Sequence, residues 1–600
     1  MNTQPFGSFQ RKNILSIILW IGILILIGRL YQLQYIYSEE LGKKSEENSI
    51  RKVTKTPMRG YIYDRNGILL VDNHPSYSVT LTPVDFDTTS LPLLSSIIEI
   101  PIETIREKIK KAKQYSQFSA MRLKRDVDFS TLSKLEEYKT QLSGIEVENE
   151  SKRYYTNTVR ASHLFGYAKE IAEWQLGKLG NYYQQGDIVG SAGLEAKYEK
   201  QLRGEKGYEL IAQNAKGQTI GPFNEKKNDV LPKDGLELHL SLDAKVQALA
   251  ESLLTNKSGA VVALDTKTGG VIAFVSKPDY DLSNFSGITP PEVWNALNND
   301  EGKPLYNRAT MAIYPPGSTF KMLLAIAALE NHIIDEHWSV QCTGAFRFGN
   351  KIFKDLHVHG KTSLIKAIEQ SCNVYFYQLM LKVGLDKWSE MCKQFGFGEL
   401  SNIDILEENP GLIPSTKFFD KTYGVGKWTQ GYLVSLGIGQ GEVSVTPLQM
   451  ANYTAMLANK GNYHQPHVVE KIYNKSKNTF DTLSYKQRHI TISEKTWNLV
   501  REGMRQVVME KGTGGGAKIP GIEVAGKTGT AQNPHGKDHS WFVGFAPFDN
   551  PQIAICVIVE NAGYGGAVAA PIAGLCMEQY LYGSIIRNKK KEENLITIQQ

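Results

Sequence analysis

A serine and a lysine three residues apart are the first candidates for chemistry in this sequence. Ser318 and Lys321 lie in the stretch AIYPPGSTFK, and the apolar run MLLAIAALE that follows is typical of a buried helix. Residues three apart share one helix face, so the amine of Lys321 can approach the hydroxyl of Ser318. A serine becomes a good nucleophile when a base takes its proton, and a buried lysine can be that base. A serine N-cap beside a solvated lysine explains this short stretch at least as well.

The residues before the serine predict a rigid turn. Pro315, Pro316 and Gly317 place Ser318 at the N-terminus of the predicted helix. Unpaired backbone N–H groups and the helix dipole at such an end favour a developing oxyanion. The turn therefore suits acyl transfer.

Two later motifs carry residues that complete this chemistry. Ser371-Cys372-Asn373 follows the helical segment TSLIKAIEQ, and Lys527-Thr528-Gly529-Thr530 lies inside an apparent strand. The order Ser-x-x-Lys, Ser-x-Asn, Lys-Thr-Gly is the signature of penicillin-binding proteins and class A β-lactamases. On these three motifs the sequence resembles those proteins.

The resemblance covers most of the chain and points to the class B penicillin-binding proteins. Within that class the sequence is most similar to the elongation-type enzymes of the penicillin-binding protein 2 subfamily. GIGQG, inside the last matching segment, lacks the spacing and context of a dinucleotide loop. The matching segments are RGYIYDRNG (59–67), KRYYTNTVRASHLFGY (152–167), GSAGLEAKYEKQLRGEKG (190–207), GAVVALDTKTGGVIAFVSKPDYD (259–281) and SLGIGQGEVSVTPLQMA (435–451).

The resemblance implies four catalytic residues. Ser318 is expected to attack the carbonyl of the penultimate D-Ala of a muropeptide stem, with Lys321 as its base. Ser371 and Lys527 are expected to relay the proton to the leaving amine and to keep the groove electropositive.

It also implies a set of substrate-binding residues. Asn373 is expected to bind the peptide amide of the substrate, and Thr528, Gly529 and Thr530 are expected to line the groove. The backbone N–H groups of Ser318 and Thr530 would form the oxyanion hole. The hydroxyls of Thr528 and Thr530 would bind the substrate carboxylate.

The expected activity is that of a serine-type D-Ala-D-Ala transpeptidase, from a family that also includes carboxypeptidases. It would cross-link peptidoglycan stem peptides during cell elongation, maintain rod shape and be acylated by β-lactams, with no cofactor required for acyl transfer. A division-type enzyme of the same class and a non-catalytic β-lactam sensor or scaffold are the alternatives. A β-lactamase shares the three motifs but leaves the membrane anchor and the pedestal unexplained.

Cys342, Asp355, His359 and Cys372 form a candidate zinc site between and within the first two motifs. Some elongation-type relatives carry zinc in this region, and the four residues resemble that set. His357 could replace either neighbour, and a disulfide between Cys342 and Cys372 or two buried thiols are alternatives. With four protein ligands, a zinc ion would be structural and would fix the loop of Ser371.

The N-terminus predicts a single membrane anchor. Arg11 and Lys12 precede the run NILSIILWIGILILIG, which continues to Leu33 with Arg29 as its one charge. No cleavage site follows, so we expect an uncleaved helix with the first residues cytoplasmic. The net charge of +6 over 600 residues is mild and gives no support for nucleic acid as a partner.

Together these patterns predict a multidomain protein of α+β and α/β type. Strands at both ends of the second half, with helices between them, suggest one domain whose terminal strands share a sheet. The resemblance implies an elongated α+β pedestal of the dimerisation type, followed by a β-lactamase-like transpeptidase fold with an antiparallel sheet flanked by helices. The expected segments are a cytoplasmic tail (1–12), an anchor (13–33), the pedestal (34–225), the transpeptidase domain (240–586) and a polar tail (587–600).

The location follows from the anchor together with the resemblance, and the partners other than the membrane follow from the resemblance. The expected location is the bacterial inner membrane, with a single pass and a periplasmic catalytic domain. The expected partners are the membrane, peptidoglycan stem peptides, a glycan polymerase of the SEDS type and other members of the elongation complex.

Overall fold

A computed structural model of the chain divides into two compact units. The first unit contains residues 1–57, 78–148 and 205–234, and the second contains 58–77, 149–204 and 235–600. Parts of the predicted tails (1–8 and 588–600) and of the predicted pedestal (38–49) lie outside the described residues. The described residues are 9–37, 50–118, 120–180, 182–214, 219–287, 289–534 and 536–587.

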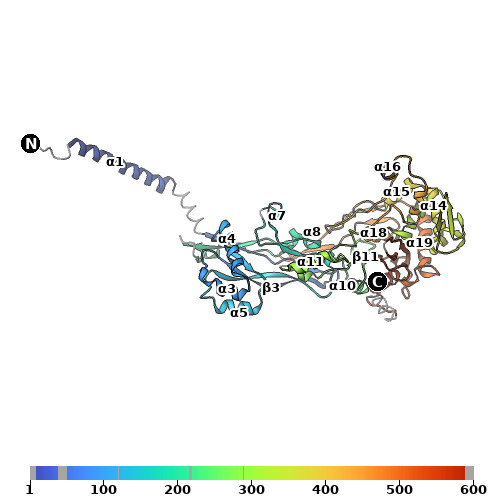
Figure 1. Cartoon of the computed structure of the whole chain (residues 1–600), viewed down its shortest axis with the longest axis horizontal. Coiled ribbons are helices and arrows are strands. Elements are labelled where there is room, and N and C mark those ends of the chain that lie inside the picture. Colours follow the sequence, from blue (N-terminus) through green and yellow to red (C-terminus); the bar gives the residue numbers. More distant parts are fainter. Residues whose placement is uncertain are drawn as a thin grey trace, which may run out of the picture. The chain divides into compact units, whose positions relative to one another are not determined.

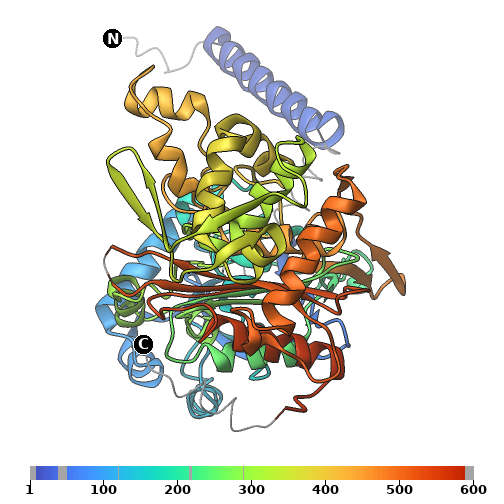
Figure 2. The same cartoon turned by 90° about the vertical axis from the view of Figure 1, so that its right-hand side faces the viewer.

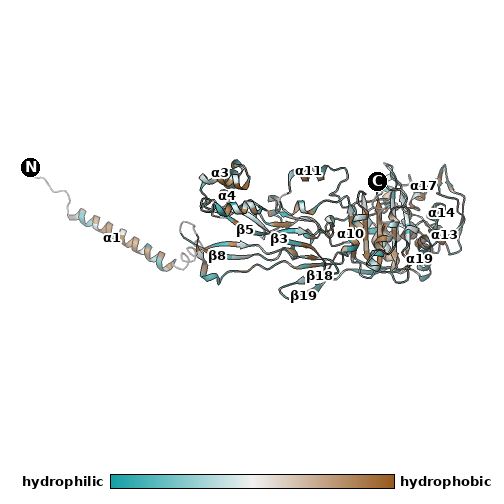
Figure 3. Cartoon of the chain, turned by 90° about the horizontal axis from the view of Figure 1, so that it is seen from below, coloured by the Kyte–Doolittle hydropathy of each residue, from teal (hydrophilic) through white to brown (hydrophobic). Residues whose placement is uncertain are grey.

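One helix near the N-terminus is long and apolar enough to cross a membrane. α1 (Phe9–Tyr31) continues into the π-helical turn η1 (Gln32–Ile36). The 25 residues Lys12–Ile36 have a mean hydropathy of 2.3, and none of the apolar window is buried within the protein. Figure 3 shows the hydrophobic colouring along α1. About 20 apolar residues are enough for a helix to span a bilayer core, so the predicted anchor at 13–33 has spanning length.

The first unit is a small α+β module. Its helices lie together in Figure 1 and bury Leu94, Ile98 and Ile105 completely. The helices are α3 (Leu91–Ile98), α4 (Ile102–Tyr115) and α5 (Phe129–Glu137). One strand group pairs β8 (Gly207–Gln213) with β1 (Ile50–Lys55) and β9 (Thr219–Pro222), and another pairs β4 (Met121–Lys124) with the end of β3 (Leu69–Leu81).

The second unit begins with the strand-turn-strand motif at RGYIYDRNG. β2 (Ile62–Tyr63) pairs antiparallel with β3, and the Asp64 carboxylate accepts hydrogen bonds from the backbone N–H groups of Asn66 (2.8 Å) and Ile68 (2.7 Å). Gly67 closes the turn with a positive φ of 81°, which glycine adopts without strain. The sheet continues through β10 (Glu237–Leu240), β18 (Val469–Asn474) and β19 (Thr479–Thr482), and β5 (Ile145–Tyr155) also pairs with β3.

A buried ion network joins three of the matching segments within the second unit. The Glu195 carboxylate, which is fully buried, accepts hydrogen bonds from Arg59 (2.5 Å) and from Arg153 (2.6 Å). Arg59 also donates to Glu199 at 2.7 Å. Burial alone would raise the pKa of Glu195, but the two guanidinium groups hold it below its usual value. The charged residues of RGYIYDRNG and GSAGLEAKYEK therefore stabilise the fold.

The second unit is built around a five-stranded antiparallel sheet with helices on both faces. The strand order β12-β11-β23-β22-β21 brings the two ends of the predicted domain together, as expected. Figure 2 shows α10 and α20 below this sheet, and α18 and α19 pack on its other face. The elements are β11 (Gly259–Asp265), β12 (Val271–Lys277), β21 (Ala525–Ala531), β22 (His539–Ala546), β23 (Ile553–Val559), α10 (Ala244–Leu253), α18 (Pro447–Ala458), α19 (Glu494–Met509) and α20 (Ala569–Tyr582).

The helix after the serine is apolar on all sides because it lies inside the unit. α12 (Lys321–Glu330) is buried from Lys321 to Leu329 and contacts α14, α15 and α19. A helix in this position holds its first residue, Lys321, away from solvent. Its neighbours are α13 (Leu364–Glu369), α14 (Asn373–Val383) and α15 (Leu385–Gln394).

Short elements complete the second unit. Two hairpins lie between α12 and α13: β13 (Ser339–Cys342) pairs with β16 (Gly360–Ser363), and β14 (Ala345–Phe348) pairs with β15 (Lys351–Lys354). The others are β6 (Ala168–Glu170), β7 (Ile188–Gly190), β17 (Asn462–His464), β20 (Gln487–His489), α6 (Ser162–Phe165), α7 (Glu173–Leu176), α8 (Gly193–Lys197), α9 (Glu199–Leu202), α11 (Pro291–Asn299), α16 (Thr416–Tyr423) and α17 (Gly431–Leu436).

Candidate active site

The serine lies on a tight 3₁₀ turn, η5 (Gly317–Phe320), that leads into α12. Gly317 has a positive φ of 59°, and its N–H donates to the carbonyl of Gly439 at 2.9 Å. Thr319 closes the turn by donating its hydroxyl to the carbonyl of Pro316 at 2.6 Å. Ser318 itself lies on this turn and is half-buried.

Lys321 is fully buried and joins the first motif to the second. Its ammonium donates to the Ser371 carbonyl (2.7 Å), the Ser371 hydroxyl (3.2 Å) and Asn373 Oδ1 (2.7 Å). Burial lowers the pKa of Lys321 to about 8, and the negative charge of Asp355 opposes this shift only in part.

The expected contact between Lys321 and Ser318 is not a hydrogen bond in this structure. Among the described residues, no hydrogen bond joins Lys321 Nζ to Ser318 Oγ, because the three ammonium protons already have three acceptors. Loss of one proton frees a lone pair on the amine. The neutral form of Lys321 is therefore the form that can accept the proton of the serine.

The second motif is held by an unusual backbone conformation. Ser371 follows α13 with a φ of 57°, a left-handed value that costs a non-glycine residue about 1–3 kcal/mol. The turn is fixed by a hydrogen bond from the Cys372 N–H to the carbonyl of Ala367 at 3.0 Å. Asn373 then begins α14. This local conformation allows the side chains of Ser371 and Asn373 to accept hydrogen bonds from Lys321 at the same time.

The third motif lies on β21, the edge strand of the central sheet. Lys527 is fully buried and donates to the carbonyl of Thr528 at 3.0 Å. Burial, and next the positive charge of Lys321, hold the pKa of Lys527 well below its usual value. The two lysines are thus close enough to repel each other, which disfavours two charged amines at this place.

Close packing brings β21 against the serine turn. A Cβ atom on Gly529 would lie 2.9 Å from Thr319 Cγ2, and a Cβ atom on Gly317 would lie 3.0 Å from the carbonyl oxygen of Thr530. Glycine at both positions therefore permits the approach. The three predicted motifs meet at one place in the second unit.

Three contacts in the site had no signal in the sequence analysis. Gly439 in GIGQG approaches the serine turn so closely that a Cβ atom there would lie 2.2 Å from the Gly317 carbonyl oxygen. Gln440 donates its amide to the carbonyl of Thr530 at 3.4 Å. Thr513 places its hydroxyl 2.5 Å from that of Thr528. All three come from loops whose positions depend on the whole fold.

Cys342, Asp355, His359 and Cys372 gather beside the second motif, with ligand atoms within 4.8 Å of one another. Asp355 Oδ2 lies 3.5 Å from Cys342 Sγ, 3.3 Å from Cys372 Sγ and 3.6 Å from His359 Nδ1, and Cys342 Sγ lies 3.5 Å from His359 Nδ1. Ligands bound to tetrahedral zinc at usual bond lengths lie about 3.4–3.6 Å apart when sulfur, nitrogen and oxygen are mixed. The cluster has the donor types and spacing of a structural zinc site.

The structure also decides between the alternatives for these residues. His357 is exposed and is not part of the cluster, although its backbone carbonyl lies 3.7 Å from Cys342 Sγ. Cys342 and Cys372 are both buried free thiols, so the alternative disulfide between them does not form.

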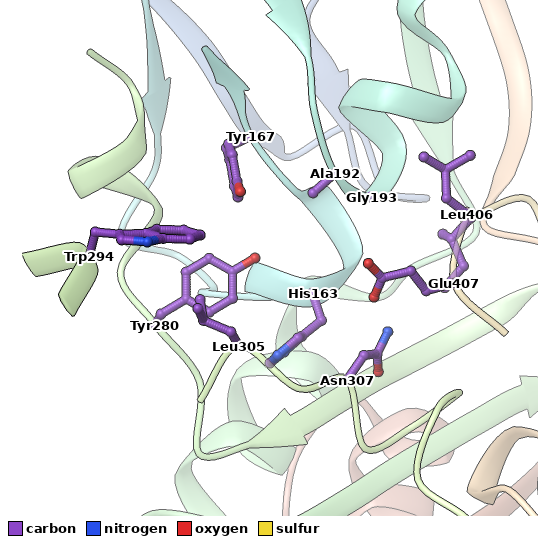
Figure 4. Close-up of a pocket in the computed structure, with 11 residues that line it drawn as sticks. His163, Tyr167, Ala192, Gly193, Tyr280, Trp294, Leu305, Asn307, Leu406 and Glu407 are labelled. Atoms are coloured by element: carbon purple, nitrogen blue, oxygen red, sulfur yellow. The ribbon is translucent and has the colours of Figure 1, made fainter. Parts of the chain in front are cut away.

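A separate cavity of about 130 Å³ lies elsewhere in the second unit (Figure 4). Its lining consists of His163, Tyr167, Ala192, Gly193, Tyr280, Trp294, Leu305, Asn307, Ile405, Leu406 and Glu407. None of the residues of the three motifs or the metal cluster lines this cavity. The three motifs therefore meet at a different place, beside β21.

Known proteins share this chain's two-part organisation. The model described as "Penicillin binding protein transpeptidase domain" matches residues 259–578, and the model described as "Penicillin-binding Protein dimerisation domain" matches residues 54–240. A protein named peptidoglycan D,D-transpeptidase MrdA, from Acinetobacter baumannii, is 34% identical over 91% of this chain and 84% of its own length.

Solved structures give the same result. Penicillin-binding protein PBP2 from Helicobacter pylori, in a complex with MreC, is 30% identical and superimposes with a TM-score of 0.77 over 89% of this chain and 99% of its own. A chain from a study titled "Structural coordination of polymerization and crosslinking by a peptidoglycan synthase complex" is 27% identical, with a TM-score of 0.70 over 96% of this chain and all of its own.

Proposed function

The chain belongs to the class B penicillin-binding proteins, and we propose that it is a peptidoglycan D,D-transpeptidase that cross-links stem peptides during cell elongation. The observation that carries this proposal is the meeting of Ser318, Lys321, Ser371 and Lys527 in one groove. The likeness to relatives named MrdA and PBP2 over most of the chain supports the elongation type.

In the first half-reaction, Ser318 Oγ attacks the carbonyl of the penultimate D-Ala while neutral Lys321 takes its proton. The C–N bond to the terminal D-Ala then breaks, and the leaving nitrogen receives a proton relayed through Ser371 and Lys527. Terminal D-Ala leaves as an amine, and the stem remains as an ester on Ser318. The backbone N–H groups of Ser318 and Thr530 would stabilise the oxyanion, and the packing of β21 against the serine turn supports this assignment.

In the second half-reaction, an amine of a neighbouring stem attacks the ester. A new amide bond forms, the C–O bond to Ser318 breaks, and the serine regains its proton. Water in place of the amine would give the carboxypeptidase outcome, which hydrolyses the same ester. Asn373 and the hydroxyls of Thr528 and Thr530 are proposed to hold the donor stem throughout.

A structural zinc ion fits the cluster of Cys342, Asp355, His359 and Cys372. Two thiols, an imidazole and a carboxylate are common zinc ligands, and their spacing suits a tetrahedral ion. Burial raises the pKa of the Cys372 thiol, so the reduced cluster without metal holds this group protonated. A bound zinc ion would deprotonate it and would tie the residue next to Ser371 to the hairpin β13–β16.

Location and partners are proposed from the same relationships. The apolar helix Lys12–Ile36 supports a single-pass anchor in the inner membrane, with the catalytic unit on the periplasmic side. The complex of a related PBP2 with MreC, and the relative from a peptidoglycan synthase complex, support an elongation complex with a SEDS-type glycan polymerase as the partner.

Intact-protein mass spectrometry after incubation with benzylpenicillin tests the assignment of the nucleophile. The wild type should gain one penicilloyl adduct that persists for many minutes, and Ser318→Ala should gain none. Ser476→Ala, at an exposed position, is the matched control and should react like the wild type. A wild-type protein that stays unmodified, or an adduct that remains in Ser318→Ala, would overturn the proposed mechanism.

A further inference from the structure

Thr513 does not belong to the three motifs, but its side chain contacts Thr528 on β21. Its hydroxyl oxygen lies 2.5 Å from the hydroxyl oxygen of Thr528, a distance that defines a short hydrogen bond. Thr528 is almost fully buried, whereas Thr513 is exposed. The pair therefore links the wall of the groove to the residue that is proposed to hold the substrate carboxylate.

The loop that carries Thr513 is fixed by close backbone packing. A Cβ atom on Gly512 would lie 2.5 Å from Val507 Cα, and a Cβ atom on Gly566 would lie 2.4 Å from the carbonyl oxygen of Thr513. The N–H of Gly514 also donates to the carbonyl of Val507 at 2.9 Å. The Thr513 hydroxyl is therefore held in place by its backbone on both sides.

The number of hydroxyl protons limits how the pair can bind a carboxylate. Each hydroxyl has one proton, so one threonine donates in the short hydrogen bond and the other accepts. If Thr528 donated to Thr513, it would offer only lone pairs to a carboxylate, which itself accepts but does not donate. If Thr513 donates, the proton of Thr528 is free for the carboxylate, and the two hydrogen bonds polarise each other.

We propose that Thr513 is a positioning residue that donates to Thr528 and so directs the Thr528 proton toward the carboxylate of the donor stem or of a β-lactam. The inference rests on the proposed function and adds a determinant of carboxylate recognition to it. The carbonyl of Thr528 is already engaged by Lys527 at 3.0 Å, so both its backbone and its hydroxyl are oriented.

The first test compares a β-lactam with and without its carboxylate. The full-length protein in detergent is acylated with benzylpenicillin and, separately, with its methyl ester, and the Ser318 adduct is followed by mass spectrometry. Thr513→Val should slow acylation by benzylpenicillin about 5- to 20-fold, chiefly through weaker binding, because it removes a donor that assists a charged acceptor. Its rate with the methyl ester should change by less than about twofold.

Three further variants serve as controls for this comparison. Thr513→Ser keeps the hydroxyl, and its acylation rate should stay within about threefold of the wild type. Thr513→Ala removes the hydroxyl with a smaller side chain than valine, so it should slow acylation as much as Thr513→Val does. Thr479→Val, on the exposed strand β19, should leave both rates unchanged. Equal slowing with acid and ester would indicate a purely structural role and would overturn the inference, as would an unchanged rate with benzylpenicillin or a serine variant as slow as valine.

A double-mutant cycle tests whether Thr513 acts through Thr528. In a Thr528→Val background, Thr513→Val should change the rate with benzylpenicillin by less than about twofold, because the group it orients is gone. Independent, multiplicative effects of the two substitutions would overturn the inference while leaving the proposed function intact. A wild-type protein that is not acylated at Ser318 would instead overturn the proposed function.

Discussion

Two lysines share one buried groove, and they are not equivalent. Lys321 has three hydrogen-bond acceptors, whereas the hydrogen bond of Lys527 goes to the carbonyl of its own neighbour Thr528. Burial removes water from an ammonium and so disfavours its charged form, which lowers the pKa of both lysines. Because burial lowers the pKa of Lys321 to about 8 and the Asp355 carboxylate opposes a larger shift, this residue can gain and lose a proton close to neutral pH.

The pKa of Lys321 leads to a prediction for the pH dependence of acylation. The neutral amine is the base, and a pKa of about 8 leaves roughly a tenth of it neutral at pH 7 and most of it neutral at pH 9. The rate constant for Ser318 acylation by a β-lactam should therefore rise about tenfold from pH 7 to pH 9. Stopped-flow measurements with a fluorescent penicillin would give the profile.

Lys321→Arg is the control for this profile. A guanidinium stays protonated over the whole range, so the variant should lose about 10²-fold or more of the rate and show no rise with pH. A wild-type rate that is flat between pH 7 and pH 9, or an arginine variant that keeps the rise, would show that another group is the base.

At the scale of elements, the turn between α13 and α14 depends on the cluster beside it. Asp355 Oδ2 accepts a hydrogen bond from the backbone N–H of Val374 at 2.9 Å. The same oxygen lies 3.3 Å from Cys372 Sγ. The cluster therefore fixes both sides of Asn373. Ser371, with its left-handed backbone, lies directly before this anchored segment.

Removal of the proposed metal should loosen this turn. We expect about one zinc ion per chain by elemental analysis of the wild type and close to none in Cys372→Ala. The variant should also acylate more slowly, since Ser371 and Asn373 lose their support. Cys556→Ala removes a buried thiol of β23 outside the cluster and should keep its zinc. A wild-type protein without zinc would exclude the metal site.

The buried carboxylate of Glu195 gives a stability prediction. Glu195→Gln leaves Arg153 buried without its counter-ion and leaves Arg59 with Glu199 alone, so the free energy of unfolding should fall by about 3–5 kcal/mol. The matched control, Glu470→Gln, removes an exposed partner of Lys471 and should cost less than about 1 kcal/mol. Denaturant unfolding would compare the two, and equal small losses would show that the network contributes little.

Glu195 also makes the free energy of unfolding depend on pH. The pKa of Glu195 is lower in the folded protein than its reference value of 4.5, so the unfolded chain binds the proton more tightly. The contribution of Glu195 to stability is present above pH 4.5 and is lost as the pH falls through the folded pKa. The difference in stability between the wild type and Glu195→Gln should therefore shrink below pH 4.5.

The sequence predicted those elements and residues whose chemistry is local. The turn at Asp64–Gly67 follows from its own Asn-Gly pair, and the shared sheet follows from apolar strands at both ends of the domain. The contacts of Thr513 and of Gly439 could not be predicted in this way. Both depend on loops that the fold brings from 15 and 122 residues away from their partners, Thr528 (528 − 513) and Gly317 (439 − 317).

At the scale of the whole molecule, the order of parts limits where the enzyme can act. An apolar helix of spanning length comes first, the dimerisation-domain match follows at 54–240, and the transpeptidase-domain match ends at residue 578. A chain held in the membrane by this helix would act on peptidoglycan within reach of that membrane.

Depletion of the protein in its own bacterium distinguishes elongation from division. An elongation-type transpeptidase cross-links the side wall, so its loss should leave division active and turn rods into round cells. A division-type enzyme cross-links the septum, so its loss should give long filaments. Phase-contrast microscopy during depletion would measure the aspect ratio, and a plasmid copy of the wild type should restore rods where Ser318→Ala does not. Filaments would reject the elongation assignment, and rescue by Ser318→Ala would show that the cell needs the chain for something other than acyl transfer.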